Sequence, residues 1–141
     1  PVPEAYQINV PSGPAAAVLY EASPLYCRVT GVLLAGSGSA RAVVPGEVLG
    51  VVTASGKWKG LATSGSNGDQ NAAGIALYAA SAPNGTDDQV VVLERGPAVV
   101  RESELVWPAA ADATARATAR AALLAKGIRV LLDGPSPTPL P

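Results

Sequence analysis

Glu102 and Glu104 are the two residues whose type and spacing come closest to a catalytic pair. Residues two apart in a β-strand point to the same face, so in an extended segment both carboxylates would lie together. Glycosidases use such a pair, in which one acid protonates the leaving group while the other carboxylate attacks the sugar or activates water. Trp107 is the one nearby side chain that could support a sugar ring, and carboxylates are common on exposed strands. We therefore expect no enzymatic activity.

Other catalytic and metal-binding groups are scarce. The chain has no histidine, which removes Ser–His–Asp and Cys–His arrangements, His-ligated zinc and the commonest general base at neutral pH. Cys27 is the single cysteine, so no internal disulfide can form, and we interpret it as a small buried hydrophobic residue. Asp87 and Asp88 have no further ligand clustered nearby and are interpreted as a solvated turn. We expect no metal and no cofactor.

Two glycine-rich stretches imitate phosphate-binding loops. Residues 36–40, GSGSA, lack the third glycine and the following helix of a dinucleotide-binding motif. Gly50 and Gly56-Lys57 imitate a Walker A loop, but five residues separate the glycines where four are required, and Trp58 stands where Ser or Thr should bind Mg²⁺. Asn84-Gly85-Thr86 matches a glycosylation acceptor, yet an Asn-Gly turn between strands explains it better. No nucleotide site is predicted.

The composition predicts one domain built mainly from strands. A chain of 141 residues can bury roughly two thirds of its unfolded surface. Hydrophobic residues make up 48% of the chain beside 15 glycines and 13 prolines, which is typical of many short strands and turns rather than disorder. The net charge is −1 and the arginines are scattered, so no nucleic-acid partner is expected. Neither a membrane span nor a signal peptide is recognised, so we expect a soluble, unsecreted protein.

Residues 90–132 contain the strongest structural pattern. Residues 90–93 and 98–101 are rich in β-branched residues and are separated by Gly96-Pro97, which predicts two short strands joined at a turn or one bent strand. Pro108 ends the strand region, because proline lacks an N–H group and fixes its φ angle. Asp112 is the predicted N-cap of an Ala-rich helix over residues 113–126.

Gly127 is predicted to end this helix, and residues 128–132 to form a last strand. Residues spaced i, i+4, i+8 share one face of the helix, and the charged set with this spacing predicts the solvated face. A second set, made mostly of small side chains, is predicted to face the core. The solvated face comprises Asp112, Arg116 and Arg120; the core face comprises Ala113, Ala117, Ala121 and Leu124. Small side chains need close approach to a sheet, so we expect the helix to cover a β-core.

Upstream, strands are expected over residues 27–34 and 73–80, and a hairpin over residues 43–63 turns at Ser55-Gly56. Residues 15–26 are ambiguous between a short helix and a loop. The division predicted from these elements is an N-terminal arm and linker over residues 1–26, a domain over residues 27–132, and a Pro-rich tail over residues 133–141.

The two ends of the chain have patterns of their own. Tyr6, Ile8 and Val10 alternate with polar or small residues between prolines, which predicts an edge strand. Such a strand could add to the sheet of another chain, or it could be the first strand of the domain's own sheet. Residues 134–141, GPSPTPLP, predict an extended, polyproline-like tail that is either solvated or docked in a groove.

The Trp-Pro stretch also carries a resemblance. Residues 104–112, ELVWPAAAD, followed by a helix and a closing apolar strand, are similar to the C-terminal signature of the head decoration protein D family of tailed bacteriophages. Residues 46–52, GEVLGVV, with GKW at 56–58, resemble the hairpin of that family, and residues 73–77, AGIAL, resemble its following strand. The resemblance covers about residues 27–132.

This resemblance implies a fold and a role. The fold would be a mainly β, β-clip-like small barrel or sheet domain with one helix. The protein would be made in the host cytoplasm and bind as homotrimers at threefold and quasi-threefold positions on the outer surface of an expanded phage head, which it cements. The arm residues Tyr6, Ile8 and Val10 would add a β-strand to the major capsid protein. Leu105, Trp107 and Pro108 would form a structural or trimer corner. Neither a nucleic acid, a membrane nor a small-molecule substrate is implied as a partner.

The alternative is a free β-rich module that binds a carbohydrate or another surface. Such a module needs an exposed aromatic side chain on which a sugar can stack. Trp58, flanked by Lys57 and Lys59, is the candidate.

Overall fold

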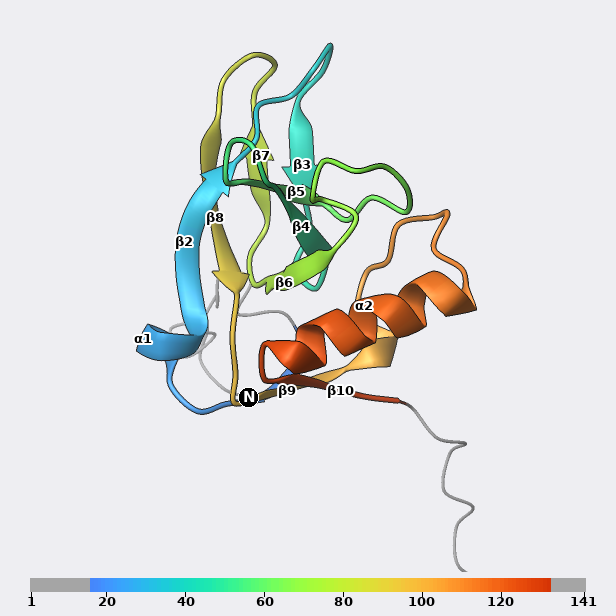
Figure 1. Cartoon of the computed structure of the whole chain (residues 1–141). Helices are drawn as coiled ribbons and strands as arrows, with labels where there is room; N and C mark the ends of the chain where they lie inside the picture. Colours follow the sequence, from blue (N-terminus) through green and yellow to red (C-terminus); the bar gives the residue numbers. More distant parts are fainter. Residues whose placement is uncertain (1–15, 133–141) are drawn as a thin grey trace, which may run out of the picture.

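The computed structural model describes residues 16–132 (Figure 1). Within this range ten strands form three sheets and one main helix packs against them, so the prediction of a mainly β domain with one Ala-rich helix is confirmed. The predicted arm strand with Tyr6, Ile8 and Val10, and the Pro-rich tail, lie outside the described residues.

A closed barrel forms the larger half of the fold. Its strands, in spatial order, are β2 (Arg28–Leu33), β5 (Lys57–Gly60), β4 (Val48–Val52), β6 (Ala72–Ala76) and β8 (Asp88–Leu93). All neighbours are antiparallel except β2 and β5, which meet in parallel at one residue pair. Closure leaves no free sheet edge among these five strands.

The β4–β5 hairpin confirms the expected turn. Val51 lies opposite Trp58, and Gly56 in the turn has a φ of +71°, a conformation that glycine adopts without steric cost. The expected strand over residues 73–80 is shorter than predicted, since it ends at Ala76. The chain then forms β7 (Ala80–Ala82), which pairs with β3 (Arg41–Val43) as a separate ribbon.

A second, three-stranded sheet closes the other end of the molecule. Its order is β1 (Val18–Glu21), β9 (Ala98–Arg101) and β10 (Ile128–Leu131), with β1 antiparallel and β10 parallel to β9. The segment that was ambiguous in the sequence therefore contains β1, followed by the short helix α1 (Pro24–Cys27). Residues 90–93 and 98–101 are two strands, as one of the alternatives predicted, but they belong to different sheets.

Helix α2 (Ala113–Ala125) connects the parallel strands β9 and β10. Parallel neighbours need such a crossover, because the chain must return to the starting end of the sheet. The expected caps are present: the Asp112 carboxylate accepts a hydrogen bond from the Ala115 N–H at 2.8 Å, and Gly127 has a φ of +88°. In Figure 1, α2 lies between the barrel and the three-stranded sheet, in contact with β6 and β10. The helix therefore covers a β-core as expected.

The predicted core face of α2 is wrong. Leu124 is 61% exposed, whereas Ala119 and Leu123 are buried. The other three predicted core residues, Ala113, Ala117 and Ala121, are also exposed. Alanine is compatible with either face, so an Ala-rich helix gives a weak periodic signal, and the one completely buried leucine decides the orientation. The arginines predicted to be solvated, Arg116 and Arg120, are half-buried.

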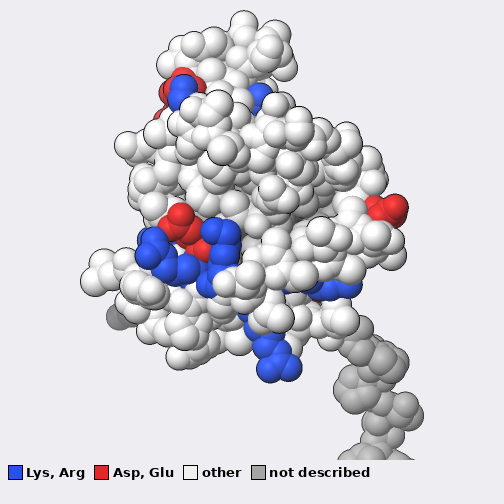
Figure 2. Space-filling view, in the orientation of Figure 1, with Lys and Arg blue, Asp and Glu red and all other residues white. Residues whose placement is uncertain are grey.

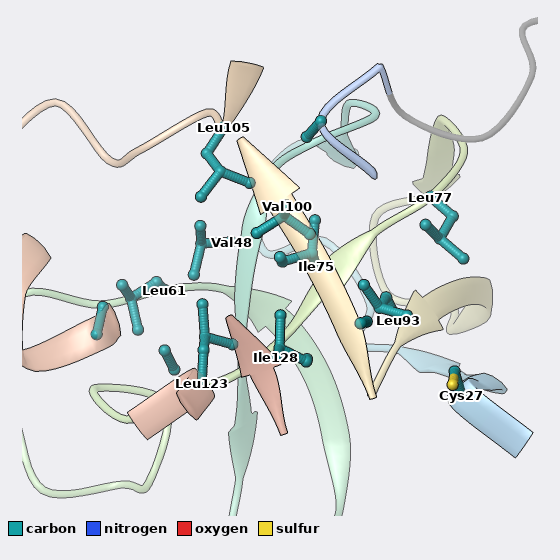
Figure 3. Packing of buried hydrophobic residues seen from close by; sticks show 14 residues of the cluster. Cys27, Val48, Leu61, Ile75, Leu77, Leu93, Val100, Leu105, Leu123 and Ile128 are labelled. Atoms are coloured by element: carbon teal, nitrogen blue, oxygen red, sulfur yellow. The ribbon is translucent and has the colours of Figure 1, made fainter. Parts of the chain in front are cut away.

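The main hydrophobic cluster lies where the barrel, the three-stranded sheet and α2 meet. Figure 3 shows side chains from all three converging there; they include Val48, Ile75, Leu93, Val100, Leu123 and Ile128. A second cluster includes Leu33, Leu49, Trp58, Val90 and Val92 of the barrel strands. Cys27 is completely buried and belongs to the main cluster, as predicted for a small hydrophobic residue.

Candidate interaction surfaces

The Trp-Pro corner, residues 102–108, joins β9 to α2. After β9 the chain makes a 3₁₀ turn, η2 (Glu102–Glu104), and then runs beside the start of β4. The Val106 N–H donates to the Gly46 carbonyl at 2.8 Å, and the Val106 carbonyl accepts from the Val48 N–H at 3.1 Å. These two bonds fix the corner to the barrel, so its position relative to the core is set by backbone pairing.

Leu105 and Trp107 contribute unequally to the core. Leu105 is 7% exposed and lies near Val48 and Val100 (Figure 3). Trp107 is half-buried and packs against the same cluster. Pro108 is half-buried, and its carbonyl accepts from the Ala111 N–H at 2.9 Å, which turns the chain toward the Asp112 cap. Leu105 is thus a structural residue, while Trp107 borders both core and solvent.

Arg116 of α2 lies over the Trp107 ring. Its guanidinium carbon is 5.6 Å from the ring centroid, within the range of a cation–π interaction. Nε of Arg116 and Nε1 of Trp107 are both buried, and neither has a hydrogen-bond partner within the described part of the chain. Both side chains line an open groove whose other walls are Glu102, Ser103, Leu105 and Val106. We call this the Trp107–Arg116 groove.

The two glutamates of the corner do not form a strand-face pair. They lie in η2, where Glu102 is half-buried and Glu104 is exposed. Glu102 accepts a hydrogen bond from Arg120 at 2.6 Å and so ties the turn to α2. The strand assumed for these residues ends at Arg101, and one of the two carboxylates is held in an ion pair.

Trp58 is 5% exposed and packs inside the barrel, so it does not offer a ring on which a sugar could stack. Its neighbours are engaged too. Lys57 binds Asp87 at 2.6 Å, and Lys59 binds Asp69 at 2.9 Å. The hydrogen bond from Lys57, with one from the Ala35 N–H, lowers the pKa of Asp87. Asp87 therefore holds two segments together rather than being only a solvated turn residue, and the carbohydrate alternative loses its candidate.

Four exposed apolar side chains lie near the start of the described chain. They lie on β1 and α1 and comprise Leu19, Tyr20, Leu25 and Tyr26. Leu25 is 97% exposed. Charged side chains accompany them: Arg28 forms an ion pair with Glu21, and the Arg95 guanidinium lies 5.1 Å from the Tyr26 ring centroid. On the face drawn in Figure 2, positive and negative side chains are mixed in a few places, while a broad area carries neither.

Glu47 is a half-buried carboxylate at the start of β4. Burial raises its pKa, which a hydrogen bond with the Val44 backbone only partly opposes. Its Oε2 atom is buried and has no hydrogen-bond partner within residues 16–132. The charged form of Glu47 is therefore poorly solvated in the folded state.

The described residues contain no group of three or more potential metal ligands. No helix within residues 16–132 has the length and hydrophobicity needed to cross a membrane. The fold is that of a small β-rich protein. Its distinguishing surface features are the Trp107–Arg116 groove and the exposed apolar side chains of β1 and α1, which suit contacts with other proteins rather than catalysis.

Comparison with models of known families identifies the particular group. Residues 7–128 match the family described as Bacteriophage lambda head decoration protein D. The match covers most of the 141 residues, so the chain belongs to this phage head decoration family. No curated protein matches the chain. The family assignment places the protein on the virion capsid, in a structural role.

Proposed function

We propose that this protein binds the outer surface of an expanded phage head as trimers at threefold and quasi-threefold positions, and that it cements the shell. The observation that carries the proposal is the family match over residues 7–128. A protein that binds the assembled shell but not separate subunits stabilises the shell by mass action. Cementing in this way requires no catalytic residue.

The proposed partner of the N-terminal arm is the major capsid protein. The alternation of Tyr6, Ile8 and Val10 supports β-strand addition, in which backbone hydrogen bonds supply affinity and alternate side chains supply specificity. Ten extended residues span about 33 Å. Three arms on one trimer would multiply a weak contact into avidity.

The arm would extend from the three-stranded sheet. β1 pairs with β9 on one side, so residues 18–21 are held in the domain and the reach must come from the residues before them. We propose residues 27–132 as the body of the decoration domain, with β1 of the preceding linker paired to it, and residues 133–141 as a Pro-rich tail. The proposed location is the outer face of the virion, after synthesis in the host cytoplasm.

Addition of purified protein to expanded heads that lack decoration tests this proposal. The wild-type chain should bind expanded heads to saturation, bind unexpanded heads weakly, and raise the temperature at which the heads disrupt. Ile8→Pro should reduce occupancy by at least about tenfold, since it removes a donor from the arm strand, while the melting temperature of the free protein stays unchanged.

Ser12→Pro is the matched control, because position 12 lies beyond the alternating residues and already follows Pro11. It should bind like the wild type. Equal binding of the wild type to expanded and unexpanded heads, or none to either, would contradict the proposed role. Full occupancy by Ile8→Pro would contradict the role of the arm alone.

A further inference from the structure

Arg116 differs from the other arginines of the described chain. Three of them have a carboxylate partner, in the pairs Arg28–Glu21, Arg95–Glu94 and Arg120–Glu102. Arg41 donates to the carbonyls of Leu34 and Ala35, while Arg101 and Arg129 are exposed to water. Arg116 is half-buried, yet within residues 16–132 it has no carboxylate partner and its Nε has no acceptor. A buried N–H group of a guanidinium without an acceptor is destabilising.

Trp107 is the aromatic partner of Arg116 in the cation–π contact. Its indole N–H is buried without an acceptor in the described chain, and it lines the same groove as Arg116. Val106, 40% exposed, adds an apolar wall. Trp and Arg beside a small apolar surface are the residue types that dominate protein–protein contacts. The groove therefore fits a carboxylate carried by another protein chain, which would meet the half-buried Arg116 guanidinium beside the Trp107 ring.

Glu104 is the acid of this chain that best fits the groove. Of the described acids, Glu21, Asp69, Asp87, Glu94 and Glu102 are in ion pairs. Glu47 is half-buried, Asp112 caps α2, and Asp88 accepts from the Gln89 N–H. Glu104 is exposed, with neither an ion pair nor a hydrogen bond from its side chain to the rest of residues 16–132, and it does not line the groove.

The same corner thus offers a donor groove and, beside it, an unused acceptor. Two such complementary patches on every copy make a contact that repeats from one copy to the next, and it forms a ring when the rotation between copies closes. The contact would lie close to the rotation axis, because both patches belong to residues 102–116.

We propose that the Glu104 carboxylate of one copy enters the Trp107–Arg116 groove of a neighbouring copy. This contact links the three copies within one trimer. The proposal rests on the trimer of the proposed function. The carboxylate pairs with the part of the half-buried Arg116 guanidinium that faces the groove, beside the Trp107 ring. Glu102 does not compete for Arg116, because the Glu102 carboxylate is already paired with Arg120.

A charge exchange tests the pairing. Arg116→Glu and Glu104→Arg are prepared singly and together, with Arg129→Glu and Asp88→Arg as controls at exposed positions. Sedimentation equilibrium measures the association constant. Each single exchange at the contact should weaken association at least about tenfold per contact, the double exchange should recover most of the loss, and the controls should behave like the wild type. If the wild type is monomeric in solution, occupancy on undecorated heads is compared for the same proteins.

Glu104→Gln supplies a readout that does not depend on a charge reversal in the groove. The chain has two tryptophans, so two indole N–H signals are expected by NMR. The Trp107 signal should shift on dissociation of the wild-type assembly and lie near its dissociated position in Glu104→Gln. Unchanged association in both single exchanges, or a double exchange as weak as the singles, would overturn the pairing. Neither result affects the proposed function, which fails separately if the wild type does not bind heads.

Discussion

A single missing side chain makes room for the aromatic residue of the barrel. Gly31 lies in the middle of β2 opposite Val90, and a Cβ atom built there would come within 2.4 Å of Trp58 Nε1. Gly31 lies within the strand expected over residues 27–34, where a glycine would ordinarily weaken a strand. The structure shows an intact strand whose glycine accommodates the indole ring, which explains how a Trp between two lysines can be buried.

Gly31→Ala should therefore destabilise the fold by about 1–3 kcal/mol through overpacking against Trp58. Urea unfolding followed by Trp fluorescence measures the loss. Gly60→Ala is the control in a neighbouring strand, since its nearest contact would be Glu47 Oε1 at an ordinary 3.9 Å. Equal stability of the two variants would contradict the packing described for Trp58.

Glu47 and Asp87 predict opposite dependences on pH. The pKa of Glu47 is raised in the folded state, so its ionisation opposes folding and stability is lost as pH rises through the folded pKa. Glu47→Gln should raise the free energy of unfolding at pH 7, and its advantage should disappear as pH falls toward the ordinary Glu range, about pH 4.

Asp87→Asn is the contrasting variant. The pKa of Asp87 is lowered, so the charged form supports folding above the unfolded pKa, and this support is lost as pH falls through the folded pKa. The variant should be less stable than the wild type at pH 7 and approach it in acid. Denaturant titrations at several pH values measure both effects, and matching signs for the two variants would contradict these environments.

At the scale of elements, helix α2 shows what sequence patterns can and cannot predict. Its limits followed from local chemistry, since Asp112 accepts from the Ala115 N–H and Gly127 adopts a positive φ. The orientation of the helix could not be predicted in the same way, because alanine gives a weak hydrophobic periodicity and two adjacent leucines lie at the C-terminal end. Only the packing against β6 and β10 distinguishes Leu123 from Leu124.

These two leucines form a matched test. Leu123 is 0% exposed and Leu124 is 61% exposed. Leu123→Ala should destabilise the protein by about 2–5 kcal/mol because it leaves a cavity in the core, whereas Leu124→Ala should change stability by less than about 0.5 kcal/mol. Thermal or chemical unfolding measures both. A larger effect at Leu124 would restore the helix orientation that the sequence pattern suggested.

For the whole molecule, strand content was predictable but sheet membership was not. Local patterns identified the β4–β5 hairpin and the strands on either side of Gly96-Pro97. They did not reveal that β8 closes a barrel while β9 joins β1 and β10, since those pairings connect segments far apart in the chain. β1 was missed because four residues beside a short helix give little periodicity. The family resemblance was confirmed, whereas the corner and arm residues remain proposals.

The central claim is that this protein decorates phage heads in stoichiometric amounts. Gel densitometry of purified particles should compare the band near 14.0 kDa with that of the shell subunit. We predict a ratio of about one to one, as expected when trimers fill the threefold and quasi-threefold positions. Absence of the 14.0 kDa band from intact particles would contradict the account.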